Sequence, residues 1–211
     1  MSGIPLAHLG CMNTRAGVGL TAAAIAAGGA VAVKRDTTMA VDRAVRRRIH
    51  PLRSPKVTAV AKGISYLAGP RIHPAVAAAL SALLRIERGR GGYAASAASV
   101  AALGVDNAVR LFIHQRRPPG ATRRHSRYRY AFPSGHTTAA TAISVAVAAG
   151  IEDELPRSQR ILLWTAVAAV AFGVGWSRLY LDEHWLDDVV GGWLAGTAIG
   201  LAAASLDARF A

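Results

Sequence analysis

The chain has 211 residues, 52% hydrophobic and 18% charged, which suits either one soluble domain or a small bundle of membrane helices. A single cysteine excludes an intrachain disulfide, and 25 Lys and Arg against 12 Asp and Glu give a formal charge of +13, which indicates anionic partners. Because the basic residues gather between uncharged apolar runs and aromatic residues make up only 6%, we expect anionic head groups or a phosphorylated substrate as partners and no nucleic acid.

The first apolar run covers residues 16–33 and carries no charge. Its 18 residues are enough for a helix across the roughly 30 Å hydrocarbon layer, so it predicts a first membrane span. The alternative is a secretory signal peptide, because Ala30, Val31 and Ala32 resemble a small-residue cleavage site. Residues 36–67 alternate charged and apolar side chains and are interrupted by prolines, which predicts a short amphipathic helix at the membrane surface and a connector.

Five further apolar runs each predict one membrane helix. They cover residues 72–84, 91–109, 137–151, 161–176 and 189–206. We therefore expect an all-α fold: a six-transmembrane-helix bundle, with the interfacial helix after the first span, forming a single domain over residues 1–211. A soluble bundle with an Ala-rich core is the alternative, but repeated uncharged runs favour the membrane because soluble helices carry a polar face. In the last run, Gly192, Gly196 and Gly200 have the spacing that lets two membrane helices approach closely.

Two arginines follow the third predicted span. Arg110 and Arg117 are two helical turns apart, so we expect both to project from one helix face before Pro118 and Pro119 end the helix. A guanidinium group binds phosphate oxygens through two parallel hydrogen bonds and stays charged at ordinary pH. The alternative is a pair of anchors at the membrane interface.

The tetrapeptide Pro133-Ser134-Gly135-His136 directly precedes the fourth predicted span. A helix that begins here would direct its first amide groups at an anion, with the Ser134 hydroxyl as a further donor. The small Gly135 would permit close approach, and His136 would lie beside the anion. The alternative is an ordinary helix start.

A third pattern combines Ser177, Arg178, His184 and Asp188. If residues 183–190 are helical, His184 and Asp188 lie four residues apart on one face, where the carboxylate can orient the imidazole and stabilise its cation. This is the arrangement of an activated nucleophile, and the alternative is a structural ion pair.

Together these motifs resemble the type 2 phosphatidic acid phosphatase superfamily, whose patterns are Lys-x6-Arg-Pro, Pro-Ser-Gly-His and Ser-Arg-x5-His-x3-Asp. The second and third patterns are matched in full, at residues 133–136 and 177–188. The first is matched with Arg110 in place of Lys, which keeps the charge and changes its reach and geometry.

The resemblance implies a membrane phosphatase in which His184 attacks phosphorus and forms a phosphohistidine, Asp188 orients it, and His136 acts as general acid. Five residues are expected to hold the phosphate: Arg110, Arg117, Ser134, Gly135 and Arg178. We expect no metal and no cofactor. The rival readings are a non-catalytic membrane scaffold or lipid-binding protein with the same fold, and a soluble relative that resembles acid phosphatases or haloperoxidases.

The expected substrate is a lipid-linked phosphate: a polyprenyl diphosphate, a polyprenyl-phosphosugar phosphate or a phospholipid phosphate, with a polyprenyl lipid favoured. Six spans place all three motifs on one side of the cell membrane. That side also holds more Lys and Arg, so the positive-inside rule favours a cytoplasmic active site. A basic rim is expected beside it, formed by Arg116, Arg123, Arg124, His125, Arg127 and Arg129. Nothing in the sequence indicates an oligomeric state.

Overall fold

The computed structural model describes residues 21, 38–88, 92–122 and 129–209. Over these residues the protein is helical and has no β-strand. The α-helices are α2 (Met39–Ile49), α3 (Pro55–Leu67), α4 (His73–Arg88), α5 (Ala94–Phe112), α6 (Gly135–Ile151), α7 (Arg157–Tyr180) and α8 (Leu186–Asp207). Short 3-10 helices, η1 (His50–Leu52) and η2 (Glu152–Glu154), follow α2 and α6. The first predicted span and its signal-peptide alternative lie outside the described residues.

Helices α4 to α8 each contain most of one predicted apolar run, so the all-helical prediction is confirmed. The segment before them differs from the prediction, because it forms two helices instead of one helix and a connector. Pro51 and Pro55 interrupt the chain there, and Pro55 occupies the first turn of α3, where its missing N–H costs nothing. Ser54 then caps α3 by accepting a hydrogen bond from the Val57 amide at 3.3 Å.

The six-span count stays a prediction. Among the described residues, two helices are long and apolar enough to cross a membrane, α7 with 24 residues and α8 with 22. Helix α7 exposes large apolar side chains, among them Leu162 and Phe172. An outward apolar face of this kind is costly in water and favourable in lipid.

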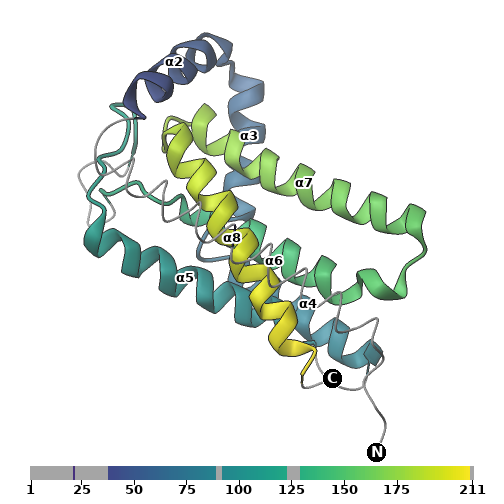
Figure 1. Ribbon diagram of the computed structural model, residues 1–211. Coiled ribbons are helices and arrows are strands. Elements are labelled where there is room, and N and C mark those ends of the chain that lie inside the picture. The colour runs from purple at the N-terminus through teal and green to yellow at the C-terminus, as the bar shows by residue number, and fades with distance from the viewer. Residues whose placement is uncertain (1–20, 22–37, 89–91, 123–128, 210–211) are drawn as a thin grey trace, which may run out of the picture.

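Helix α6 lies at the centre of the bundle, packed against α5, α7 and α8 (Figure 1). Its contact with α8 depends on the glycine spacing noted in the sequence. A Cβ atom on Gly196 would lie 2.6 Å from the carbonyl oxygen of Thr138, and one on Gly200 would lie 2.6 Å from that of Ala142. Only glycine permits this approach of two backbones, which packs α8 directly against α6.

Candidate active site

His184 lies in the loop between α7 and α8, residues 181–185, which we call the His184 loop. The prediction that residues 183–190 are helical was wrong, because α8 begins only at Leu186. The Asp188 carboxylate lies in the first turn of α8, and its Oδ2 accepts a hydrogen bond from the Trp185 amide at 2.8 Å. This bond caps the N-terminus of the helix, so α8 starts at the next residue. The same Oδ2 atom lies 3.2 Å from His184 Nδ1. The predicted imidazole–carboxylate pair is therefore present, although only one partner is in the helix.

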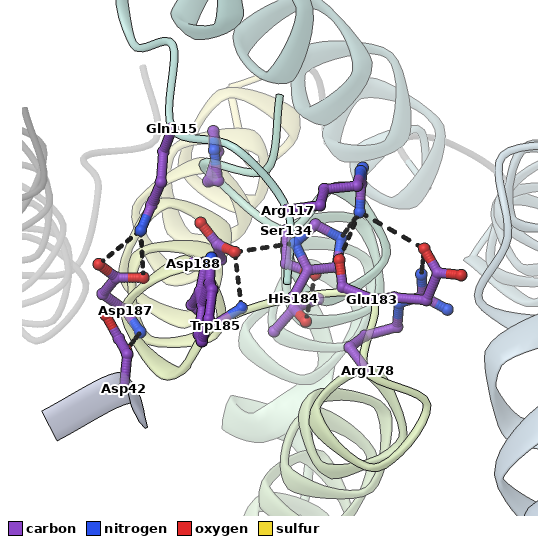
Figure 2. Close-up of polar contacts among 12 residues, drawn as sticks. Asp42, Gln115, Arg117, Ser134, Arg178, Glu183, His184, Trp185, Asp187 and Asp188 are labelled. Carbon is purple, nitrogen blue, oxygen red and sulfur yellow. Dashed lines mark hydrogen bonds and ion pairs between the residues drawn. The ribbon is translucent and has the colours of Figure 1, made fainter. Parts of the chain in front are cut away.

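The second ring nitrogen of His184 contacts Arg117. Arg117 Nη1 lies 2.9 Å from His184 Nε2 and 2.6 Å from the Glu183 carbonyl oxygen. A guanidinium group can only donate hydrogen bonds, so Nε2 is the acceptor and Nδ1 carries the proton that is donated to Asp188. Figure 2 shows His184 between these two partners. This tautomer leaves a lone pair on Nε2, as a nucleophile requires.

Burial is the main cause that lowers the pKa of His184 well below its ordinary value of 6.5, and the charges of Arg117 and Arg178 lower it further. Both effects disfavour the imidazolium form. The imidazole is therefore neutral at neutral pH.

Arg117 does not extend from the same helix as Arg110, which corrects the prediction. Helix α5 ends at Phe112, and the chain continues in extended form, with the Ala131 amide donating to the Gln115 carbonyl oxygen at 2.8 Å. This pairing between the chain before Pro118 and the chain before α6 takes the place of the expected last helical turns. It carries Arg117 to the His184 loop.

Arg110 is held by Asp106, one turn earlier in α5. Its Nη1 lies 2.6 Å from Asp106 Oδ2. The same carboxylate lies against Gly135, where a Cβ atom would come within 2.8 Å of Oδ2. A side chain at position 135 would therefore collide with the Asp106 carboxylate.

The prediction that a helix begins at the Pro-Ser-Gly-His motif is confirmed. Helix α6 starts at Gly135, and its first amides have no acceptor within the helix, as in any α-helix. Ser134 is fully buried and its hydroxyl accepts a hydrogen bond from Thr137 at 3.0 Å. Its amide donates to the Asp188 carbonyl oxygen at 3.0 Å, which fastens the start of α6 to the start of α8. The predicted contact of the Ser134 hydroxyl with phosphate stays a prediction.

Two cavities meet at His136. The first, of about 350 Å³, is bordered by five of the predicted residues: Arg110, Arg117, Gly135, His136 and His184. The second, of about 250 Å³, is bordered by His136 and Arg178. Ser134 and Asp188 border neither cavity and lie buried behind the first one. Among the described residues, no group of three His, Cys, Asp or Glu side chains could hold a metal ion.

Glu183 is a buried acid that sequence reasoning missed. Its Oε2 atom lies 3.7 Å from both Arg117 Nη1 and Arg178 Nη2, and its Oε1 atom accepts hydrogen bonds from the amide and hydroxyl of Thr122. Arg178 also donates to the Ser65 hydroxyl on α3. Glu183 therefore orients two predicted phosphate-binding arginines. Its only signal in the sequence is its place beside His184.

A second acid, Asp182, fixes the His184 loop to α2. It has a positive φ of 60°, and Arg46 donates to its two oxygens at 2.7 and 2.8 Å. Burial would raise the pKa of Asp182, but the hydrogen bonds and charge of Arg46, with smaller contributions from Arg53 and the Gly120 amide, lower it below its ordinary value.

Asp187 links α8 to the same surface helix. Its amide donates to Asp42 Oδ1 at 3.1 Å, and its carboxylate accepts from Gln115 (Figure 2). The same carboxylate also accepts from the Thr38 hydroxyl. Burial and the neighbouring Asp187 charge raise the pKa of Asp42 to about 7. Helix α2 therefore binds both Asp182 and Asp187, which lie before and after His184 in the chain.

Comparison with known proteins agrees with this arrangement. The sequence model of the PAP2 superfamily matches residues 92–210, more than half of the chain. The chain belongs to the PAP2 superfamily. A comparison with curated protein sequences found no match.

The fold of this PAP2 protein is similar to a solved structure described as the first transmembrane PAP2 type phosphatidylglycerolphosphate phosphatase from Bacillus subtilis. The TM-score is 0.80, with 21% sequence identity over 90% of this chain and 96% of that one. The two proteins therefore share their architecture over nearly their whole lengths.

Proposed function

We propose that this protein is a membrane phosphatase that removes a phosphate group from a lipid-linked substrate through a phosphohistidine at His184. The observation that carries the proposal is the neutral His184 tautomer, with Nδ1 bound to Asp188 and Nε2 bound to Arg117, in a residue that borders a cavity lined by arginines. Membership in the PAP2 superfamily and the phosphatase among its structural neighbours support the same reaction class.

In the proposed first step, His184 Nε2 forms a bond to phosphorus while the bond from phosphorus to the leaving oxygen breaks. Arg117 must first release Nε2 and donate to phosphate oxygens instead, together with Arg110, Arg178 and the first amides of α6. Asp188 stabilises the positive charge that develops on the ring. Positioning and charge compensation are the main catalytic demands of phosphoryl transfer.

His136 borders both cavities, so it can reach the leaving oxygen of a phosphate bound beside His184. We propose that it donates a proton to this oxygen and then removes a proton from the attacking water. Water cleaves the phosphorus–nitrogen bond, inorganic phosphate leaves, and His184 returns to its neutral form.

The membrane setting and the lipid substrate are part of the proposal. They are supported by the apolar helices α7 and α8 and by the exposed apolar face of α7. The solved neighbour is named for a phospholipid phosphate, and a polyprenyl phosphate presents the same group at the same depth. A polyprenyl-linked substrate remains our preferred choice, because no additional domain is present among the described residues to bind a large head group.

The test is phosphate release from short-chain lipid phosphates by the detergent-solubilised full chain. We expect His184→Ala to abolish release, while His114→Ala, at an exposed histidine that stacks on Tyr130, retains it. Brief incubation with ³²P-labelled substrate should label the wild type with an acid-labile, base-stable phosphate that His184→Ala lacks. Equal release by the wild type and His184→Ala would disprove the proposed nucleophile.

A further inference from the structure

The two cavities that meet at His136 differ in their relation to the nucleophile. His184 borders the first cavity but not the second, whereas His136 borders both. In phosphoryl transfer the attacking and leaving atoms lie roughly in line, on opposite sides of phosphorus. If the phosphate occupies the first cavity beside His184, the leaving oxygen points towards His136 and the second cavity. The second cavity therefore lies on the leaving-group side.

The wall of this second cavity carries two cations outside the three motifs. Lys62 extends from α3, and Arg71 lies in the turn between α3 and α4 and borders both cavities. Both side chains are exposed. Among the described residues, no carboxylate lies within ion-pair distance of either one.

Among the described residues that border this cavity, Glu183 is the one acid, and it does not neutralise these cations. Glu183 is occupied by Thr122 and lies next to Arg117 and Arg178. The cavity therefore presents excess positive charge where the leaving group must lie. A plain alkyl chain would gain nothing from such a wall, because burying ammonium and guanidinium groups against hydrocarbon is unfavourable. A second anionic group would be stabilised there by charge-assisted hydrogen bonds.

Building on the function proposed above, we infer that Lys62 and Arg71 form a binding site for a second phosphate group of the substrate, next to the one that is removed, so that the enzyme favours lipid diphosphates over lipid monophosphates. For a diphosphate, the bond from the terminal phosphorus to the bridging oxygen breaks as the bond to His184 Nε2 forms. His136 protonates the bridging oxygen, and water later releases the terminal phosphate. The products are one lipid monophosphate and one inorganic phosphate.

The decisive experiment compares farnesyl diphosphate with farnesyl monophosphate, which share one tail, on the full chain in detergent. We expect the wild type to have the higher kcat/KM with the diphosphate. Lys62→Gln combined with Arg71→Gln should lower kcat/KM for the diphosphate by about tenfold or more, since a hydrogen bond to a charged group is commonly worth that factor. Lys62→Gln alone, at the cation that does not border the first cavity, should stay within about twofold of the wild type with the monophosphate. Lys56→Gln, at an exposed lysine on the same helix that borders neither cavity, is the matched control.

Two results would overturn the inference: an equal loss with both substrates, or no loss with the diphosphate. Both leave the proposed phosphatase function intact, because phosphate release would still depend on His184. If the wild type releases phosphate from neither substrate, the proposed function fails instead, and binding then tests the site.

For the binding test, calorimetry on His184→Ala measures both farnesyl compounds without turnover. We expect tighter binding of the diphosphate, with the difference lost when Lys62 and Arg71 are both replaced by Gln. Equal binding of the two compounds would refute the site. In short-chain phosphatidylglycerol phosphate, a glycerol separates the two phosphate groups. Both assays with this compound show which spacing between the two phosphates Lys62 and Arg71 accept.

Discussion

The chemistry of the site depends first on which nitrogen of His184 carries the proton. Arg117 donates to Nε2 and Asp188 accepts from Nδ1–H, so hydrogen bonding alone selects the tautomer. Burial and two neighbouring arginines then keep the ring uncharged. The same cations that are predicted to hold the phosphate therefore also keep this ring in its neutral form.

The first prediction concerns the titration of this ring. Because burial, Arg117 and Arg178 lower the pKa of His184, the ring should stay neutral at pH 6.5 and gain a proton only well below it. Arg178→Gln removes a cation and should raise that pKa, which moves protonation to higher pH. Nitrogen-15 NMR of the histidine rings in detergent measures both effects, with His184→Gln to identify the signal. A ring half protonated at pH 6.5 or above in the wild type would contradict this account.

The second prediction concerns Asp188. In Asp188→Asn the side chain keeps its shape but loses the charge that compensates the imidazolium, so kcat should fall by about 10⁴-fold, as for an acid that orients a catalytic histidine. The matched control is Asp187→Asn. The Asp187 carboxylate contacts Gln115 and Thr38 instead of His184, and its loss should lower kcat far less. Equal losses in the two variants would show that the carboxylates act only through folding.

At the scale of single elements, α2 is the helix that fixes the His184 loop from outside the motifs. It crosses one end of the bundle beside the adjoining ends of α7 and α8 (Figure 1). Arg46 binds both oxygens of Asp182, and Asp42 accepts the Asp187 amide. The amphipathic pattern that predicted a surface helix also gives this helix an inner polar face.

The third prediction tests this contact. Arg46→Ala should leave Asp182 buried without its main partner and lower the free energy of unfolding by roughly 1–3 kcal/mol, together with kcat. Arg47→Ala, at an exposed neighbour, should change neither. Thermal unfolding in detergent and kcat are measured in both. If the effect of Arg46→Ala depends on Asp182, the substitution should change the free energy of unfolding little in an Asp182→Ala background. The same loss of stability in both backgrounds would refute the pairing.

The fourth prediction concerns the contact between α6 and α8. Gly196→Ala would place a methyl group 2.6 Å from the Thr138 carbonyl oxygen, so the helices must separate, at a cost of about 1–3 kcal/mol. Gly173→Ala on α7 meets nothing within 4 Å and should stabilise its helix by about 0.5–1 kcal/mol. Melting temperatures in detergent should therefore move in opposite directions. Equal shifts would mean that Gly196 does not set the helix distance.

At the scale of the whole molecule, helix α7 gives the bundle two distinguishable ends. Helix α7 runs from Arg157 to Tyr180, and the Tyr180 hydroxyl accepts the Ser54 amide at 2.8 Å. Lys56 therefore lies near the active-site end of α7 and Arg157 at the other end. If α7 crosses the bilayer, these two exposed residues face opposite sides.

The fifth prediction uses this geometry. In a Cys11→Ser background, Arg157→Cys should react with a membrane-impermeant maleimide in intact cells. Lys56→Cys should react only after permeabilisation, as expected for a cytoplasmic active site. Labelling of both from the same side would contradict a crossing by α7. The opposite pattern would reverse the predicted orientation.

The sequence by itself determined the helical class, the approximate extent of α4 to α8, and five of the residues that border the first cavity. Apolar runs and short motifs are local patterns, and a helix or its first turn depends mainly on residues a few positions apart. The start of α6 at the Pro-Ser-Gly-His motif followed from such a local pattern, and the helix begins there at Gly135.

Only the tertiary structure decided how those residues are held. Arg117 leaves its helix because the chain before Pro118 pairs with the chain before α6, and His184 precedes α8 because Asp188 caps that helix. Arg46 and Asp182 lie 136 positions apart, and no local pattern specifies a contact over that distance. The physical reason is that a buried charge needs a partner wherever the fold can supply one, and the fold brings that partner from a distant part of the chain.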